Sequence, residues 1–389
     1  MRPAALTFKS CAEVSGPFPQ DNPAGFHRWL SDQLSCSLPG ERWDAARRGR
    51  RYASLEALLC DLERGYSDLG LEIVTSTGTS GRASIVVRDA ATIALATQAF
   101  FSGIRDVWGV ERGTALVFLM PEHTRIAMAR TARFGTRSLD WAADSPVYYT
   151  IPFAATPDQM RVRAGRIFRS GLEGVVERRV LNPFMNWAYV HLAEPRALAT
   201  TLACLDRCIA EDRPLMLLGG LVQLHALTQA VAKRRGGPLV LPAGSRVATG
   251  GGVKEQYAVS PSRIREDLRA AFAAPVTDVY GMAEANWGAF ECDACNHHLP
   301  PWLYPVVTDD DDRILDGPDV TGLLAFFDPA GGGDLIPPFF QTADRVRLVN
   351  GAGQVEPGLA CPCGREGSYI AGSIQRVDLT EEAGCAAQV

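Results

Sequence analysis

The stretch LEIVTSTGTSGRASIVVR, residues 71–88, decides the fold. Two short apolar runs, 71–75 and 84–88, flank a loop of glycine and small hydroxyl residues, which predicts two strands joined by a Gly-rich turn. Glycine has no side chain to block a ligand, so backbone N–H groups and hydroxyls of such a loop can converge on phosphate oxygens. The segment therefore predicts a phosphate loop made of Thr75, Ser76, Thr77, Gly78, Thr79, Ser80 and Gly81.

The loop is not one of the common nucleotide-binding fingerprints. The Gly-Lys-Ser/Thr ending of a Walker loop and the G-x-G-x-x-G spacing of a Rossmann fold are both absent. Short Gly-rich motifs also match by chance, so a polar hairpin turn is the alternative interpretation.

Strand-like and helical segments alternate through most of the remaining chain. Strands are expected at 115–120, 147–151, 214–219, 245–252 and 276–281, and helices at 89–104, 125–133, 156–170, 194–211, 222–234 and 261–273. Such alternation predicts an α/β fold with parallel sheets covered by helices, and Asp89 is suited to cap the first helix.

The helical pattern stops near residue 300. LYPVVTD, GLLAFFD and RVRLV, separated by Gly, Pro and Asp, predict a small C-terminal β-rich lobe. The expected organisation is a helical lead-in at 1–68, α/β nucleotide- and substrate-binding lobes at 69–299, the β-rich lobe at 300–380 and a flexible tail at 381–389.

Composition and charge exclude several classes of protein. The 389 residues are 47% hydrophobic and 21% charged, as in ordinary globular proteins. A net charge of -5 disfavours nucleic acid as the main partner. The start has no long apolar segment, and the most apolar window, 215–232, contains Gln223, His225 and Gln229. That window predicts a strand followed by a buried helix, so we expect a cytoplasmic protein with no membrane span.

A second motif, YGMAE at 280–284, follows a predicted strand. Tyr280 can stack on an adenine ring and Gly281 permits a sharp turn. Glu284 can hold Mg²⁺ beside a triphosphate, because a hard cation prefers oxygen ligands. The alternative is a strand end with a solvated carboxylate.

A third motif is QTADRVR at 341–347. In a turn, the Asp344 carboxylate can accept two hydrogen bonds from ribose hydroxyls. A surface turn that enters a strand, with no ligand, is the alternative.

Taken together and in this order, the three motifs resemble the adenylate-forming superfamily of acyl-CoA ligases, peptide-synthetase adenylation domains and luciferases. The hydroxyl-rich loop matches 76–81, Tyr-Gly-x-x-Glu matches 280–284, and Thr-Gly-Asp matches 342–344. The glycines at 250–252 resemble the adenine-flanking loop of acyl-protein synthetases and phenazine-cluster relatives. The segments CPCGR at 361–365 and GSIQRVD at 372–378 are similar to phenylacetate coenzyme A ligases.

The resemblance implies the large N-terminal domain of the adenylate-forming ligase fold, with ATP and Mg²⁺ bound. The implied reaction is ATP-dependent activation of a carboxylic acid, aromatic or natural-product, to acyl-AMP, with transfer to a separate acceptor such as a carrier protein or a downstream acyltransferase. The implied catalytic residues are Glu284, Lys254 and His123. The implied nucleotide-binding residues are those of the loop together with Gly251, Gly252, Tyr280, Gly281, Met282, Ala283, Asp344 and Arg365.

The chain also departs from the pattern of that superfamily. The usual Pro-Lys of the loop is replaced by Ala83 and Ser84, so Arg82 or Lys254 has to supply the missing cation. Ala343 replaces a glycine and Ala283 a threonine. The chain is about a hundred residues shorter than usual, a gap of domain size, so we expect the C-terminal lid domain and its lysine to be absent. These departures favour the rival hypothesis of a non-catalytic nucleotide- or acyl-binding protein, and His123 is equally consistent with a surface or helix-capping residue.

Two close groups of cysteines predict a metal site. Cys292, Cys295 and His298 follow the second motif, and Cys361 and Cys363 lie near the C-terminus. Zn²⁺ prefers four such ligands in a tetrahedron, so we expect structural zinc, with His297 as a substitute for His298. Free buried thiols are the alternative.

A lone cysteine, Cys385, lies in the tail EEAGCAAQV. Acyl-protein synthetases can take the acyl group onto a cysteine near the chain end, so transfer through Cys385 is the leading alternative mechanism. No neighbouring base or cation is present to lower the pKa of its thiol.

Overall fold

The computed structural model describes residues 52, 54–66, 70–76, 85–138, 144–163, 165, 171–251, 257–283, 285–329, 339–352, 354 and 356–377. Its helices are α3 (Leu55–Tyr66), α4 (Ala90–Asp106), α5 (Ala127–Ser138), α7 (Pro157–Arg163), α8 (Gly171–Val176), α9 (Asn182–Ala188), α10 (Glu194–Ala210), α11 (Leu221–Arg235) and α12 (Pro261–Phe272), with π turns η3 (Glu177–Leu181) and η4 (Tyr189–Ala193) and the 3-10 turn η5 (Pro357–Leu359). Its strands are β1 (Leu71–Thr75), β2 (Ile85–Asp89), β3 (Ala115–Pro121), β4 (Val147–Ile151), β5 (Leu215–Gly220), β6 (Arg246–Gly250), β7 (Val276–Tyr280), β8 (Ala289–Glu291), β9 (Asn296–His298), β10 (Tyr304–Thr308), β11 (Asp319–Phe327), β12 (Phe339–Val349) and β13 (Tyr369–Arg376).

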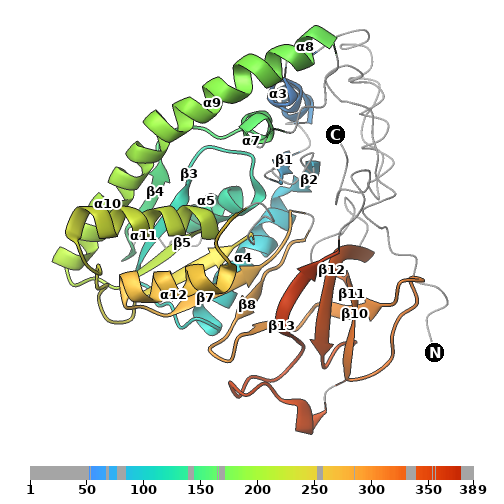
Figure 1. Cartoon of the computed structure of the whole chain (residues 1–389). Coiled ribbons are helices and arrows are strands. Elements are labelled where there is room, and N and C mark those ends of the chain that lie inside the picture. Colours follow the sequence, from blue (N-terminus) through green and yellow to red (C-terminus); the bar gives the residue numbers. More distant parts are fainter. Residues whose placement is uncertain are drawn as a thin grey trace.

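An eleven-stranded sheet runs through the molecule in the order β10-β11-β12-β13-β9-β8-β7-β6-β5-β3-β4. The five strands from β7 to β4 pair in parallel, and every other pairing in this sheet is antiparallel. The predicted α/β class with a β-rich C-terminal part is therefore confirmed. The β-rich strands continue the same sheet as the parallel strands (Figure 1).

Helices cover both faces of the parallel strands, which explains their continuous apolar sequences. Alternate residues of β3 enter different cores: Val117 packs in the core that α10, α11 and α12 complete, and Phe118 in the core that α4 and α5 complete. Strand β5 divides in the same way, with Leu217 in the first core and Leu218 in the second.

Strand β8 joins the parallel and antiparallel parts. Ala289 packs in a third core with residues of β10 to β13, whereas its neighbour Phe290 packs in the core with α4. Phe290 lies so close to α4 that a Cβ added at Gly103 would stand 2.1 Å from its ring, so only glycine fits there.

The hairpin β1–β2 forms a separate two-stranded sheet, paired from Leu71 with Asp89 to Thr75 with Ile85. This confirms the predicted pair of strands around the loop. Asp89 caps α4 as expected, because its side chain accepts a hydrogen bond of 2.6 Å from the backbone N–H of Thr92.

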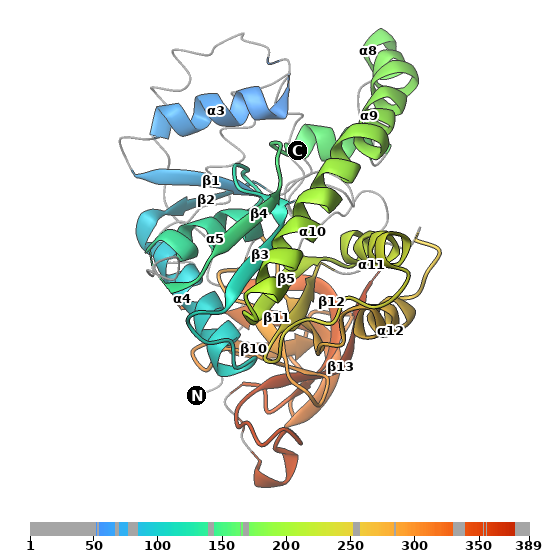
Figure 2. The ribbon, with the colours of Figure 1, turned by 90° about the vertical axis from the view of Figure 1, so that its left-hand side faces the viewer.

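Residues 171–210 form one continuous helical arm, α8-η3-α9-η4-α10, which Figure 2 shows extending past the rest of the molecule. We expected helices at 156–170 and 194–211 and assigned nothing to 171–193. Of the first expectation, the structure confirms α7, which ends at Arg163, and residues 164 and 166–170 lie outside the described part of the chain. The missed part carries its apolar residues on the side away from the protein, opposite to the pattern that identifies a surface helix.

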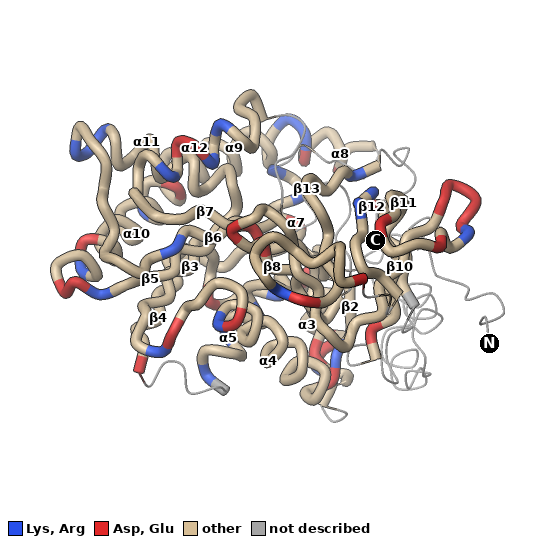
Figure 3. Tube along the Cα trace, turned by 90° about the horizontal axis from the view of Figure 1, so that it is seen from below, with Lys and Arg blue, Asp and Glu red and all other residues tan. Residues whose placement is uncertain are grey.

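Charged residues of both signs are distributed along the trace in Figure 3. Among the helices of the described residues, none combines the length and the apolar character that a bilayer crossing requires.

Candidate functional site

A hydrogen bond joins the second and third motifs. The hydroxyl of Tyr280, at the end of β7, donates to Asp344 Oδ2 on β12 at 2.8 Å. Removal of this hydroxyl from water and the neighbouring Asp344 carboxylate raise the pKa of Tyr280 above its usual range, so Tyr280 stays protonated and acts as a donor. Arg376 lies on the other side of Asp344, with Nε 3.4 Å from Oδ1.

Asp344 lies inside a strand, not in a turn, so that part of our expectation was wrong. Leu323 and Ala325 are two residues apart on β11, but their partners Arg345 and Gln341 are four apart on β12. Residues 342–344 therefore form a β-bulge, a device that reorients side chains next to active sites. Within the bulge the backbone N–H of Asp344 donates to Thr342 Oγ1 at 3.0 Å.

The hairpin that carries the hydroxyl-rich loop is tied to the second motif by Arg88. Its guanidinium, on β2, donates to the carbonyls of Ala283 at 2.6 Å and Ala285 at 2.8 Å. Ala283 also packs in a small buried cluster with Val74 of β1 and Val86 of β2. These contacts hold both ends of the loop beside the residues that flank Glu284.

The glycines after β6 lie next to the second motif. Gly250 pairs with Val279 in the parallel register of β6 and β7, so Gly251, just after β6, and Tyr280, the last residue of β7, lie at the carboxyl ends of adjacent strands. Gly251 has a φ of +81°, which favours glycine. Crevices at the carboxyl ends of parallel strands are the usual ligand sites of open α/β sheets.

Several predicted residues lie outside the described part of the chain: Thr77, Gly78, Thr79, Ser80, Gly81, Gly252, Lys254, Glu284 and Cys385. The structure brings together the segments that flank the hydroxyl-rich loop and Glu284, and the individual roles of all these residues stay predictions. Gly281 and Met282 are described and lead from Tyr280 to Ala283.

The contacts of His123 and Arg365 in the described structure are with residues other than Tyr280 and Asp344. His123 comes two residues after β3, with 69% of its side chain exposed and Nε2 3.9 Å from Glu122. Arg365 donates to the carbonyl of Asp106, at the end of α4. That bond gives Arg365 a structural role, and a nucleotide contact for it stays a prediction.

Sequence reasoning missed Arg88 and the role of Arg376 beside Asp344. Arg88 is a charged residue at the end of an apolar strand, and only 2% of it is exposed. A buried arginine needs partners, so its place in the run SIVVR was a usable signal. The partner carbonyls, 195 and 197 residues away, could not be identified from sequence.

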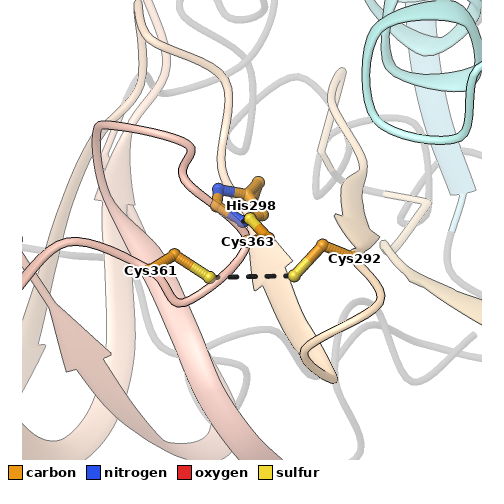
Figure 4. Close-up of side chains that lie close together, drawn as sticks. All are labelled: Cys292, His298, Cys361 and Cys363. Carbon is orange, nitrogen blue, oxygen red and sulfur yellow. Dashed lines mark hydrogen bonds between the residues drawn. The ribbon is translucent and has the colours of Figure 1, made fainter.

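Four of the five predicted metal ligands form a compact cluster, shown in Figure 4: Cys292, His298, Cys361 and Cys363. Their ligand atoms all lie within 4.8 Å of one another. The Cys292 and Cys361 sulfurs are 3.7 Å apart, and Cys363 Sγ lies 3.2 Å from His298 Nε2. Sulfurs bound at about 2.3 Å to a tetrahedral Zn²⁺ lie roughly 3.8 Å apart, so the donor set and its spacing fit zinc.

The pleat of β9 selects His298 over His297. Neighbouring residues of a strand point to opposite faces, and His297 Nε2 faces Asp278 Oδ2 at 3.4 Å. Cys295 is also outside the cluster: it is exposed and adopts a φ of +58° in the tight turn between β8 and β9. The substitution of His297 for His298 that we allowed is therefore not what the geometry favours.

The surroundings of the cluster suit metal ligands. Burial, with the nearby charges of Arg365 and His297, lowers the pKa of His298 to about 4, so its imidazole is neutral near pH 7. Burial opposes ionisation of Cys361, but hydrogen bonds to its sulfur, led by that of the Asn296 amide at 3.2 Å, lower its pKa. Burial raises the pKa of Cys292 to about 12, and a bound cation reverses such a shift.

The sequence model of the family described as acyl-protein synthetase, LuxE, matches residues 191–389, just over half of the chain. The chain belongs to this family. The match confirms the acyl-protein synthetase branch of the resemblance and contains Tyr280, Asp344 and the cysteine cluster. The hairpin β1–β2 lies before it, so the hydroxyl-rich loop is linked to the LuxE region through the contacts of Arg88.

Solved structures of adenylate-forming ligases are also similar to this chain. O-succinylbenzoate coenzyme A synthetase (MenE) from Bacillus subtilis, in complex with ATP and magnesium ion, is 13% identical with a TM-score of 0.43, over 72% of this chain and 47% of that chain. A 2-hydroxyisobutyryl-CoA ligase in complex with 2-HIB-AMP and CoA is 14% identical with a TM-score of 0.49, over 92% of this chain and 71% of that chain. A long-chain-fatty-acid-CoA ligase from Archaeoglobus fulgidus is 13% identical with a TM-score of 0.43, over 72% of this chain and 49% of that chain. This chain spans about half the length of the first and third of these proteins, and no curated protein sequence matches it.

Proposed function

We propose that this protein uses ATP to activate a carboxylic acid as acyl-AMP and passes the acyl group to a separate acceptor. The observation that carries the proposal is the meeting of three stretches distant in sequence. Tyr280 bonds Asp344 across 64 residues, and Arg88 bonds Ala283 across 195. Membership of the LuxE family supports the same activity.

Two unsatisfied polar groups beside these stretches support a ligand site. The Thr75 hydroxyl, at the base of the loop, and the indole N–H of Trp287, whose ring centroid lies 6.1 Å from that of Tyr280, are buried without a hydrogen-bond partner in the described structure. Buried unsatisfied donors cost about 1–3 kcal/mol each, and a ligand rich in oxygen atoms offers acceptors to such a region.

In the proposed site, each motif holds one part of the nucleotide. The hydroxyl-rich loop holds phosphates, Tyr280 and the glycines after β6 border the base, and Asp344 accepts from ribose hydroxyls. A carboxylate offers about four lone-pair sites, so Asp344 can bond a ribose while it keeps Tyr280 and Arg376. Glu284 would hold Mg²⁺, and that ion, when bound, neutralises charge on the phosphates.

The reaction needs an acid that is activated and an acceptor that receives the acyl group. We propose an aromatic or natural-product acid, on the resemblance of the motifs, and a protein acceptor such as a carrier protein, on the family description. His123 follows β3 at the same edge of the sheet as Gly251 and Tyr280, which supports a place for the acid near that edge.

Isotope exchange between pyrophosphate and ATP tests the activity directly. We expect exchange with at least one acid of a panel, and its loss in Glu284→Ala. Glu266→Ala, at an exposed position on α12, is the matched control and should exchange like the wild type. Binding of ATP without exchange for any acid would instead support the non-catalytic binder.

Transfer through a cysteine is the second candidate, favoured by the family match, whose span includes Cys385. Incubation with ATP and a labelled acid distinguishes the two routes. A covalent label on this chain that disappears in Cys385→Ser would establish the cysteine route. Label that reaches only an added acceptor protein would establish direct transfer.

We further propose that Cys292, His298, Cys361 and Cys363 bind a structural Zn²⁺. The three sulfurs and one imidazole, with the two sulfurs of Cys292 and Cys361 3.7 Å apart, support this proposal. The ion would link the β8–β9 turn to the segment before β13. It would thereby stabilise the part of the sheet in which β13, β9 and β8 lie beside β7. Cysteines that are to bind a metal have to stay reduced, and a reducing compartment keeps them so, which fits the cytoplasmic location that we propose.

A further inference from the structure

The outer side of the helical arm is strongly apolar. Fifteen large apolar residues are exposed in the described structure, and nine of them lie on the arm between 172 and 192. We call these nine the outer stripe: Leu172, Val175, Val176, Val180, Leu181, Phe184, Trp187, Val190 and Leu192. Their exposed fractions run from 40% to 85%.

The opposite side of the arm is polar and faces the protein. Arg161 of α7 binds Glu177 through two contacts of 3.1 and 3.2 Å. The Asn182 amide donates to the carbonyl of Arg163, and the Arg163 guanidinium lies 3.3 Å from the ring centroid of Tyr189. A helix at a protein surface normally has the reverse arrangement, so the apolar side is built for another partner.

The two π turns keep much of the stripe in line. Leu172, Val176, Val180 and Phe184 are four residues apart, and in an α-helix each such step advances by about 40° around the axis. The wider turn of η3 lies in the middle of this series and offsets the drift. Aromatic rings continue the same line. The ring centroids of Phe184 and Trp187 are 6.3 Å apart, and those of Trp187 and His191 are 5.6 Å apart.

The area of the stripe is that of a stable protein interface. Nine large apolar residues that are each 40–85% exposed along one side of the arm form an apolar patch larger than the roughly 300–600 Å² of the largest patch on a typical monomer. Such a patch is of the order of the roughly 800 Å² that each partner contributes to an interface of standard size. The exposed charged residues of segment 171–193, namely Glu173, Arg178 and Arg179, are of both signs.

We propose that the outer stripe is the contact surface between two copies of this chain. An isologous pair uses the same surface on both subunits, so that surface has to be self-complementary. An uncharged apolar stripe meets its own copy without like-charge repulsion. Two such arms side by side would each cover the surface that the other exposes.

The test uses the full chain and Val180, which lies near the middle of the stripe and therefore near the twofold axis of a pair. Light scattering during size exclusion should give the wild type twice the 42.0 kDa of the chain. Val180→Glu and Val180→Lys should each be monomers, because like charges then face each other. An equimolar mixture of the two variants should regain the double mass, because opposite charges pair.

Leu95→Glu is the control, since Leu95 is 47% exposed on α4, away from the stripe, and this variant should stay a dimer. Circular dichroism should show all variants folded, because Val180 is 57% exposed. A wild-type monomer at all concentrations, dimeric Val180 variants, or a mixture that stays monomeric would each overturn the proposal. ATP binding by calorimetry should be equal in all variants, which separates this test from that of the proposed function.

Discussion

Tyr280 and Asp344 show what the sequence reveals about single residues. Their presence in one site was predictable, because each belongs to a motif with its own chemistry. Their direct bond was not, because the β12 bulge that turns Asp344 toward Tyr280 depends on pairing with β11. The choice between His297 and His298 likewise depends on the pleat of β9, which a run of three residues does not reveal.

Tyr280→Phe removes the hydroxyl and keeps the ring. We expect a loss of about 1.5–3 kcal/mol in the free energy of unfolding, the usual contribution of a hydrogen bond to a charged group. We also expect a raised KM for ATP in pyrophosphate exchange, because Asp344 loses the group that orients it. Unchanged stability and KM would contradict a role for this bond.

Tyr280 should also contribute to the pH dependence of stability. Its native pKa is raised above the usual 10.0, so the native state keeps a proton that the unfolded chain loses above pH 10. The contribution is complete below pH 10 and is lost as the pH rises through the native pKa. Denaturant titrations should therefore show stability falling more steeply above pH 10 in the wild type than in Tyr280→Phe.

Arg88 positions the second motif from a distance. Arg88→Met leaves the carbonyls of Ala283 and Ala285 without their donor. We expect this variant to lose about 2–3 kcal/mol in the free energy of unfolding. A merely structural role would leave the KM for ATP of the folded variant unchanged, whereas a positioning role raises it. Arg88→Lys keeps the charge without the planar donor group, so it should recover only part of the loss.

At the scale of elements, strands were easier to predict than the helical arm. The apolar runs of β3 and β5 are continuous because helices cover both faces of these strands. Asp89 indicates the start of α4 because it is suited to cap a helix. Segment 171–193 has no such signal, since its apolar residues face outward and two π turns interrupt the 3.6-residue period.

If the cysteine cluster binds zinc, the ion should stabilise the pairing of β9 with β13. Cys361→Ser should abolish bound zinc, measured by elemental mass spectrometry, and lower the melting temperature by roughly 5 °C or more, because a structural zinc site contributes directly to folding. Cys295→Ser should keep both zinc and stability. Metal-free wild type, or equal losses in the two variants, would refute the site.

The whole molecule should unfold as one unit, although the sequence predicts separate lobes. One sheet spans the parallel and antiparallel parts, and β8 contributes adjacent residues to two cores. We expect one calorimetric transition whose calorimetric and van't Hoff enthalpies agree. Gly103→Ala forces a Cβ against Phe290 and should lower the free energy of unfolding by roughly 1–3 kcal/mol. The variant should still unfold in one transition. Two separate transitions would show independent lobes.

The bond of Arg88 to Ala283 has a consequence for synthesis on the ribosome. The two residues are 195 positions apart, and at about 5–20 residues per second the arginine is made roughly 10–40 s before its acceptor. During that time the guanidinium has no native carbonyls to bond, and the nascent β1–β2 hairpin has yet to meet Ala283. Assembly of this corner is therefore a late event, completed only when nearly three quarters of the 389 residues have been translated.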